Sequence, residues 1–193
     1  MKTYLVTGAA GFIGSNFLKY ILKKYDKVEE IKVIVVDSLT YAGNLGTIKQ
    51  ELEDKRVKFE KVDIRDKKEI ERIFSENNID YVVNFAAESH VDRSIENPEI
   101  FLETNILGTQ NLLENAKKFW TIKKDENGYP LYKEGVKYLQ VSTDEVYGSL
   151  IKDYDEAIEL VIDDEAVREV VKNRKNLKTY GKKFFTEETP LDP

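Results

Sequence analysis

The sequence contains no cysteine, a single histidine and no long apolar run, and these absences exclude several kinds of protein. Without cysteine, the chain has no disulfides, no thiolate catalysis and no cysteine-ligated metal. His90 alone cannot build a multi-histidine metal site. No apolar run reaches the roughly 18 residues that a membrane span needs, and Met1-Lys2 leads directly into a strand-like run, unlike a signal peptide. We therefore expect a cytoplasmic protein without a metal site.

Charge of either sign is not collected in one place. The chain has 36 acidic and 30 basic residues among 193, a net charge of −6 and a pI of about 5.1. Because the basic residues are interspersed with acidic ones, neither nucleic acid nor an anionic membrane is an expected partner. The length suits one well-buried domain and is short for two.

Apolar strand-like runs alternate with helical patterns along the first 141 residues. The strand-like runs are 3–7, 31–36, 56–62, 81–85 and 136–141, and the helical patterns are 13–22, 67–74 and 97–120. Near-continuous apolar strands separated by helices indicate an α/β fold, a doubly wound parallel sheet covered on both faces. The polar segment 121–135 is predicted to be a surface excursion, and 153–175 one or two amphipathic helices.

A glycine-rich segment, Gly8-Ala9-Ala10-Gly11-Phe12-Ile13-Gly14, separates the first strand-like run from the first helical pattern. In this position the first glycine permits a tight turn, the second lets a pyrophosphate approach the backbone, and the third allows a helix to pack closely on a strand. Free amide groups in the first helical turn would face the phosphates. A glycine-rich turn without a ligand is the alternative, but the strand–turn–helix context favours dinucleotide binding.

Two aspartates follow the second and third strand-like runs. Asp37 stands about 20 residues beyond the glycines, where a carboxylate accepts the two ribose hydroxyls of NAD. It would repel a 2′-phosphate, and no arginine neighbours it in sequence, so NAD is favoured over NADP. Asp63, followed by Ile64, lies where the adenine edge would be, and a capping aspartate is an equal alternative.

The segment Ser142-Thr143-Asp144-Glu145 follows the fifth strand-like run and places two adjacent carboxyl groups beside hydroxyls. Ligands of open α/β sheets bind outside the carboxyl ends of the strands, so the segment is predicted to enter that crevice. Adjacent carboxyl groups in a dry cleft have pKa values that move apart, which suits one proton donor and one proton acceptor. The pattern does not tell which is the acid, and a solvated acidic loop is the alternative.

In their order along the chain, these motifs resemble the dTDP-glucose 4,6-dehydratase family of the extended short-chain dehydrogenase/reductase superfamily. The glycine motif is common to the superfamily, whereas three segments are more specific: Thr40-Tyr41-Ala42-Gly43-Asn44, Glu88-Ser89-His90-Val91-Asp92 and Thr143-Asp144-Glu145. The resemblance implies a Rossmann-like NAD-binding domain over 1–148 and a partly helical insertion over 149–183. Residues 184–193 would begin the segment that leads to a catalytic helix. We expect the insertion to be an uninvolved surface element rather than a lid or an oligomer contact.

The resemblance also implies an activity, the NAD-dependent dehydration of dTDP-glucose to its 4-keto-6-deoxy form. NAD would take a hydride from C4 and return it to C6, while Glu145 removes the C5 proton and Asp144 protonates the departing C6 hydroxyl. Thr143 and Ser89 would contact the substrate, and His90 would be a structural hydrogen-bonding residue rather than a base. The residues implied to line the cofactor site are Gly8, Gly11, Phe12, Ile13, Gly14, Asp37, Ser38, Leu39, Thr40, Asp63, Ile64, Phe85, Ala86, Ala87, Glu88, Ser89 and Thr104.

The Tyr-x-x-x-Lys motif with which the superfamily oxidises its alcohol is absent from the expected place, beyond Thr189-Pro190. Two other matches, Tyr20/Lys24 and Tyr129/Lys133, are expected by chance in a chain with 11 tyrosines. The chain therefore resembles the N-terminal portion of a longer enzyme that also has a substrate domain. We expect the isolated chain to bind NAD weakly and not to turn over. The family forms homodimers through the helix predicted at 97–120 and the helix bearing the missing tyrosine.

Two alternative functions stay open on the sequence. One is another nucleotide-sugar epimerase or dehydratase that acts on a UDP-sugar, and the other is a non-catalytic NAD-binding module. The Asp144-Glu145 pair favours a dehydratase, because an epimerase of the superfamily is expected to carry serine or another small residue there.

Overall fold

The computed structural model describes residues 1–25, 30–143 and 146. The chain divides into two units, Met1–Val141 and Ser142–Pro193. All the helices and strands named below lie in the first unit. The amphipathic helices predicted at 153–175, the predicted insertion at 149–183 and the segment 184–193 lie outside the described residues.

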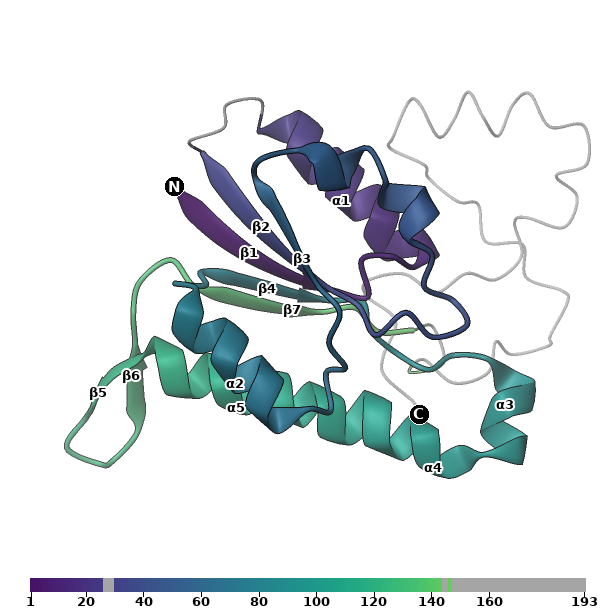
Figure 1. Cartoon of the computed structure of the whole chain (residues 1–193). Coiled ribbons are helices and arrows are strands. Elements are labelled where there is room, and N and C mark those ends of the chain that lie inside the picture. The colour runs from purple at the N-terminus through teal and green to yellow at the C-terminus, as the bar shows by residue number, and fades with distance from the viewer. Residues whose placement is uncertain (26–29, 144–145, 147–193) are drawn as a thin grey trace, which may run out of the picture. The chain divides into compact units, whose positions relative to one another are not determined.

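A parallel sheet with the strand order β3-β2-β1-β4-β7 forms the centre of the first unit (Figure 1). Its strands are β1 (Lys2–Thr7), β2 (Ile31–Val36), β3 (Val57–Glu60), β4 (Tyr81–Asn84) and β7 (Lys137–Gln140). Every neighbouring pair is parallel. The order changes direction between β1 and β4, the switch point at which α/β sheets bind ligands. The predicted doubly wound sheet is confirmed, although the third strand is shorter than the predicted run 56–62.

Helices cover the sheet on both sides of its central strands (Figure 1). On one side lies α1 (Phe12–Lys24), and on the other lie α2 (Lys67–Glu76) and a long helix that ends at Trp120. The long helix consists of α4 (Pro98–Phe101), a π-helical turn η3 (Leu102–Gly108) and α5 (Thr109–Trp120). This confirms the helix predicted at 97–120, but the Asn97 side chain makes no capping hydrogen bond. The sequence did not predict the short α3 (Val91–Glu96) before it, nor the 3-10 turns η1 (Leu45–Ile48) and η2 (Glu51–Glu53).

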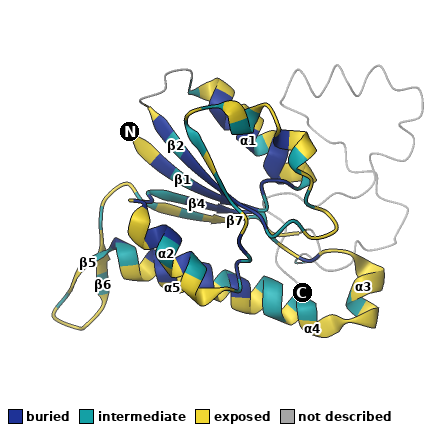
Figure 2. Cartoon of the chain, viewed as in Figure 1, coloured by how far each residue is buried: buried dark blue, intermediate teal, exposed yellow. Residues whose placement is uncertain are grey.

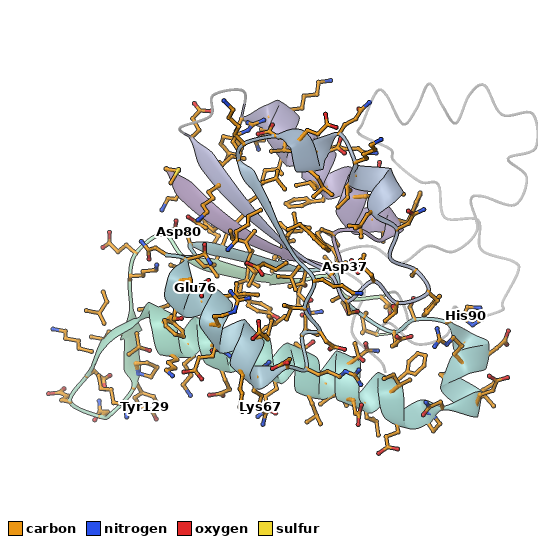
Figure 3. The ribbon with its side chains drawn as sticks, viewed as in Figure 1. Asp37, Lys67, Glu76, Asp80, His90 and Tyr129 are labelled. Atoms are coloured by element: carbon orange, nitrogen blue, oxygen red, sulfur yellow. The ribbon has the colours of Figure 1, made fainter. Side chains whose placement is uncertain are left out.

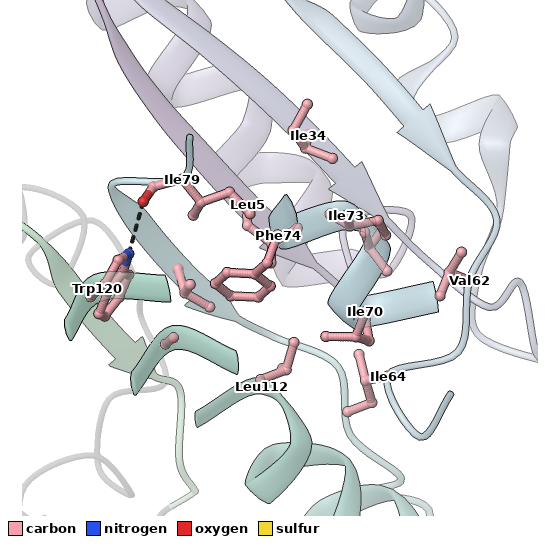
Figure 4. Packing of buried hydrophobic residues seen from close by; sticks show 13 residues of the cluster. Leu5, Ile34, Val62, Ile64, Ile70, Ile73, Phe74, Ile79, Leu112 and Trp120 are labelled. Carbon is pink, nitrogen blue, oxygen red and sulfur yellow. Dashed lines mark hydrogen bonds between the residues drawn. The ribbon is translucent and has the colours of Figure 1, made fainter. Parts of the chain in front are cut away.

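Two hydrophobic clusters lie on the two faces of the sheet, because successive side chains of a strand point to opposite faces. Leu5 belongs to the cluster beneath α2 and α5, whereas its neighbour Val6 belongs to the cluster beneath α1. Figure 2 shows the buried residues gathered along the central strands and on the inner sides of the helices. In the first cluster the Trp120 indole Nε1 donates to the carbonyl oxygen of Ile79 at 2.8 Å (Figure 4). The hydrogen bond ties the end of α5 to the residues before β4.

The predicted surface excursion at 121–135 is an antiparallel hairpin of β5 (Thr121–Lys124) and β6 (Pro130–Tyr132). Its turn is closed by the Asp125 side chain, which accepts hydrogen bonds from the backbone N–H groups of Asn127 and Tyr129. The surface position is as predicted. The two strands were not predicted, because Lys123 and Lys124 leave the segment without the alternation of apolar and polar residues that indicates a strand.

Cover is incomplete at β7, where three of the four residues are exposed. A groove of 340 Å³ runs there between the second half of α1 and the first residues of β1, β4 and β7. It is lined by Tyr4, Tyr20, Tyr25, Tyr81 and Leu139 among others, and by no residue that the sequence assigned to a site. Within the described ranges, no helix has the length and hydropathy to cross a membrane.

Candidate functional site

The parallel register brings the carboxyl ends of the strands to one edge of the sheet. Thr7 at the end of β1 is paired with Val36 of β2 and with Asn84 of β4. The residues that follow, Gly8, Asp37 and Phe85, therefore lie along the same edge. Figure 3 shows Asp37 at this carboxyl edge and Asp80 at the opposite, amino edge. The predicted glycine turn, Asp37 and the loop after β4 thus come together at the switch point.

The glycine turn has no room for side chains at its first and last glycines. Gly8 has φ +66°, and a Cβ there would stand 2.6 Å from the backbone nitrogen of Ala86 in the loop after β4. A Cβ on Gly14 would overlap the carbonyl oxygen of Gly8. The first glycine therefore makes the tight turn, as the sequence predicted, and the third lets α1 lie closely against Gly8 and Ala9, the residues that follow β1. The turn also packs against the loop after β4, a contact that the sequence did not predict.

The first turn of α1 faces outward from the glycine turn with its backbone amides free of side-chain caps. Gly11 is the N-cap residue and offers no side chain, and Ser15 N–H makes the first intrahelical bond, to Gly11 O at 3.0 Å. Phe12 and Ile13 are 85% and 60% exposed, although both are large apolar residues. The first amides of a helix lack intrahelical partners and carry the positive end of its dipole, so this turn can hold an anion.

Asp37 is almost buried, and its orientation is fixed by two backbone groups. Its Oδ2 accepts from Ala10 N–H at 2.9 Å and its Oδ1 from Leu39 N–H at 2.8 Å. Leu39 has φ 56°, a left-handed conformation that costs a non-glycine residue about 1 kcal/mol or more. An ionised carboxylate has about four acceptor positions, so each oxygen can still accept a ligand hydroxyl. Ser38 is partly buried and Thr40 exposed beside it.

Asp63, after β3, is paired with an arginine. Arg65 donates to it from its backbone N–H at 2.9 Å and from its guanidinium at 2.8 Å. Burial opposes ionisation of this carboxyl, but the hydrogen bonds and charge of Arg65 outweigh it and hold the pKa of Asp63 below its usual value. Of the two interpretations given by the sequence, helix capping belongs instead to Asp66, whose side chain accepts from Lys68 and Glu69 at the start of α2.

The loop after β4, Phe85–Ser89, is held by the π-helical turn. The Asn105 side chain of η3 accepts from Glu88 N–H at 2.8 Å and donates to Glu88 O at 2.8 Å. Thr104, predicted to line the cofactor site, precedes Asn105 and is partly buried. The Glu88 side chain is 8% exposed, and its Oε2 has no hydrogen-bond partner among the described residues. Ala87 and Ser89 are exposed on either side of it.

Three asparagines to which the sequence assigned no site role hold residues at this edge by hydrogen bonds. Asn84 is fully buried at the end of β4; it accepts from the Thr7 hydroxyl of β1 and donates to Gln140 of β7 at 2.8 Å. Asn111 of α5 donates to the carbonyl oxygen of Ile64 at 2.7 Å, and Asn105 holds Glu88. One sign of Asn105 and Asn111 was present in the sequence: asparagine is a weak helix former, yet both stand on the inward side of the helical pattern 97–120.

The predicted catalytic segment is described only at its beginning. Val141 N–H donates to Asn84 O at 3.1 Å after the end of β7, and Ser142 and Thr143 follow with exposed side chains. Asp144 and Glu145 lie outside the described residues, so their roles stay predictions. His90, expected to be a hydrogen-bonding residue, has its ring edge-on to Tyr41 at 6.3 Å between centroids.

The two chance Tyr-x-x-x-Lys matches are not at the carboxyl edge. Tyr129 is 69% exposed on the β5–β6 hairpin (Figure 3), and Lys133 donates to Asn78 and Ile79, which precede β4 at the amino edge. Tyr20 lies within α1, where the Lys24 ammonium stands 5.6 Å from its ring centroid. Neither pair can act on a ligand at the switch point. In the described part of the chain, no cluster of three or more acidic or histidine side chains could hold a metal ion.

The residues at the carboxyl edge fit a dinucleotide by their chemistry. The start of α1 suits a diphosphate, Asp37 suits a pair of ribose hydroxyls, and the unpaired Oε2 of Glu88 suits a donor that the described chain does not provide. The order of these groups follows the strand order β2-β1-β4.

Comparisons with known proteins agree with this assignment. The profile of a family described as GDP-mannose 4,6 dehydratase matches residues 5–176. The dTDP-glucose 4,6-dehydratase of Salmonella typhimurium is 46% identical over 146 residues, which are 76% of this chain and 38% of the relative. The structure of the dTDP-glucose 4,6-dehydratase of Bacillus anthracis in complex with NAD is similar over 100% of this chain and 44% of that one, with a TM-score of 0.66 and 36% identity.

A UDP-glucose 4-epimerase from Thermotoga maritima is also similar, with a TM-score of 0.58 and 32% identity over 78% of this chain and 41% of that one. The chain thus spans about two fifths of the length of the curated relatives it matches, 38% of the Salmonella protein and 40% of its counterpart from Neisseria meningitidis.

Proposed function

Because this chain belongs to the dTDP-glucose 4,6-dehydratase family, we propose that it forms the NAD-binding part of an enzyme that dehydrates a nucleotide-activated glucose. The observation that carries the proposal is the row of groups at the carboxyl edge: a turn that accepts no side chain at Gly8 or Gly14, the uncapped start of α1 and the fixed carboxylate of Asp37. The presence of NAD in the similar Bacillus anthracis structure supports the same cofactor here.

Each group has a part of the cofactor that suits it. The backbone amides at the start of α1 would hold the diphosphate, and Asp37 would accept the ribose hydroxyls. Asp63 and Ile64 would border the adenine, and Phe85–Ser89 with Thr104 the nicotinamide half. NAD, when bound, would supply the acceptor and the donor of a hydride for the sugar.

Proton transfer would belong to the segment after β7. Glu145 would take the C5 proton of the sugar and Asp144 would protonate the departing C6 hydroxyl, with Thr143 and Ser89 holding the substrate. These roles rest on the sequence resemblance, since Asp144 and Glu145 lie outside the described residues. The Asp-Glu pair supports dehydration over the alternative, epimerisation of a UDP-sugar. That alternative has to be considered because the chain is also similar to the Thermotoga epimerase.

Cofactor choice is tested by titrating the 193-residue chain with NADH and NADPH and following the nicotinamide fluorescence. We expect NADH to bind more tightly, because Asp37 repels a 2′-phosphate. Asp37→Asn keeps the size of the side chain and removes its charge. It should weaken NADH binding and narrow the difference between the affinities for NADH and NADPH.

Asp80→Asn is the matched control for this titration. Asp80 also accepts a backbone N–H, from Thr3 at 2.9 Å, but at the amino edge. It should bind NADH as the native chain does. Equal affinity of the native chain for NADH and NADPH would contradict the proposed cofactor site.

A second candidate, which the sequence also leaves open, is a non-catalytic NAD-binding module. Mass spectrometry of reactions with dTDP-glucose, UDP-glucose and UDP-galactose separates the candidates. We expect NADH binding without product from the 193-residue chain. Loss of water from dTDP-glucose would show a complete dehydratase, and conversion of UDP-galactose alone would exclude dehydration as the function.

We also propose a homodimer through the long helix, the arrangement that the resemblance implies. Four large apolar side chains are 45–58% exposed along η3 and α5: Leu102, Ile106, Leu107 and Leu113. An apolar stripe of this kind on a helix is expected to be covered by another surface. Leu113→Glu should shift the chain toward monomer in analytical ultracentrifugation, whereas Ile122→Glu, at a 69% exposed position on the hairpin, should not.

A further inference from the structure

The loop that follows β2 is fastened back onto the glycine turn. The Asn44 backbone N–H donates to Ala10 O at 3.1 Å, and the Thr47 hydroxyl donates to the same carbonyl at 3.4 Å. A Cβ on Gly43 would stand 2.7 Å from Asp37 Oδ1, so the loop lies directly against the carboxylate. The loop therefore has a fixed base on the β2 side of the carboxyl edge.

From this base the loop reaches the opposite side of the switch point. Tyr41 contacts α3, the helix after the β4 loop: Arg93 Cζ lies 4.1 Å from the Tyr41 ring centroid, and the His90 ring is edge-on to it. Since β1 lies between β2 and β4 in the sheet, this contact joins two segments that flank the glycine turn. Figure 3 shows Asp37 and His90 on the two sides that the contact connects.

The contact is exposed and depends on Arg93 stacking. Tyr41 is 52% exposed, and within the described residues no carboxylate pairs with Arg93. A guanidinium that stacks on a ring through its face keeps its in-plane N–H donors available for a carboxylate or phosphate. The in-plane donors of Arg93 thus remain available to an anionic ligand.

We infer that Tyr41, His90 and Arg93 form a clasp across the dinucleotide groove, whose ligand is the diphosphate-containing middle of a dinucleotide. The inference rests on the proposed NAD site and adds to it the residues that close it. The clasp joins the two loops between which the cofactor would pass, so the Tyr41–Arg93 contact has to open before a dinucleotide enters or leaves.

A closing contact has a kinetic signature that an ordinary binding contact lacks. Loss of an ordinary contact speeds dissociation and leaves association nearly unchanged. Loss of a contact that must open first speeds both processes. The clasp therefore predicts that variants without the stacking exchange NADH faster in both directions.

Stopped-flow NADH fluorescence with the full 193-residue chain measures both rates. Tyr41→Ala and Arg93→Ala should each raise the association and dissociation rates roughly two- to fivefold, the range expected from an exposed cation–π contact. Tyr41→Phe keeps the ring and should exchange NADH as the native chain does. The double variant should exceed neither single variant, because both remove the same contact.

Tyr20→Ala is the matched control, because Tyr20 is 58% exposed and has a lysine over its ring, but on the second half of α1. It should leave both rates unchanged. If the native chain binds NADH and the Tyr41 and Arg93 variants exchange it at the native rates, or only dissociation changes, the clasp is overturned and the proposed cofactor site stands. If the native chain binds no NADH, the cofactor site and the clasp are both overturned.

Discussion

Four loops at the carboxyl edge of the sheet fall into two groups that are held in place in different ways. The first half of the loops follows the central strands β1 and β2, and the second half follows the flanking strands β3 and β4. On the β1–β2 half, the backbone itself sets the shape: Gly8 and Gly14 accept no side chain, and Asp37 is fixed by two nearby amides. On the β3–β4 half, the amide side chains of Asn105 and Asn111 hold loops to a helix that lies far along the chain. We therefore expect the largest disruption from a side chain that overlaps the backbone of the first half, and a smaller one from the loss of a single amide side chain in the second half.

The largest effect is expected from a methyl group in the first half. Gly8→Ala would place a side chain on a residue with a left-handed φ of +66°, and its Cβ would stand 2.6 Å from Ala86 N. Ala86 N is a backbone atom and cannot move aside as the end of a flexible side chain could. We expect a loss of about 3 kcal/mol or more in the free energy of unfolding, and loss of NADH binding. Urea unfolding followed by circular dichroism gives the first quantity, and fluorescence titration gives the second.

Gly128→Ala separates the two causes. Gly128, in the hairpin turn, has φ +85° and nothing within 4 Å of a Cβ. Only the backbone strain should appear there, about 1–2 kcal/mol, with NADH binding intact. If Gly8→Ala and Gly128→Ala lowered the free energy of unfolding equally, close packing around Gly8 would not be what fixes the shape of the β1–β2 half.

The second half should fail more gently. Asn105→Ala removes both hydrogen bonds to the Glu88 backbone and leaves its N–H and C=O unpaired, so we expect a loss of about 1–3 kcal/mol. Hydrogen exchange at the Glu88 amide should quicken, and NADH affinity should fall. Asn105→Asp keeps the acceptor for Glu88 N–H and should lose less protection at that amide.

Asn16→Ala is the matched control for this pair of variants, because Asn16 donates to Phe12 O on the exposed side of α1. It should alter neither the exchange of the Glu88 amide nor the binding of NADH. Unchanged protection of Glu88 in Asn105→Ala would show that the π-helical turn does not hold the loop.

The same contrast explains what the sequence could and could not predict. Gly8–Gly14 and Asp37 stand at fixed places in the strand–turn–helix–strand pattern, so the pattern was enough to place them, although Asp37 bonds Ala10, 27 positions away, and Gly8 lies against Ala86. Asn105 bonds a residue 17 positions away and Asn111 one 47 positions away, and no local pattern identifies such pairs. The π-helical turn that aims Asn105 is a tertiary feature as well, and the apolar period of 97–120 predicted only a helix. The hairpin and α3 escaped prediction because their residues are mostly polar or exposed.

The smallest effect concerns the charge contact of the second half, between Asp63 and Arg65. Asp63→Asn removes an ionised carboxyl whose pKa in the folded chain lies below its usual 3.8. Because the folded pKa is the lower one, ionised Asp63 stabilises the folded chain above the usual pKa, and this contribution is lost as pH falls below 3.8. We expect the variant to be less stable at pH 7 by no more than about 1 kcal/mol, since Asp63 is 32% exposed and solvent screens the pair.

Urea unfolding of the native chain and of Asp63→Asn from pH 7 down to pH 2.5 tests this contribution. The difference between the two stability curves should narrow progressively as pH falls below 3.8, while Asp54 and Glu60, whose pKa values are also lowered, act in both chains and cancel. Arg65→Gln removes the pair with Asp63 and also the pair with Glu103, so it should cost at least as much as Asp63→Asn. Adding Asp63→Asn to Arg65→Gln should cost little more, because the Asp63–Arg65 interaction is already lost. A difference that does not narrow at all between pH 3.8 and pH 2.5 would mean that Asp63 acts through its hydrogen bonds and shape rather than through its charge.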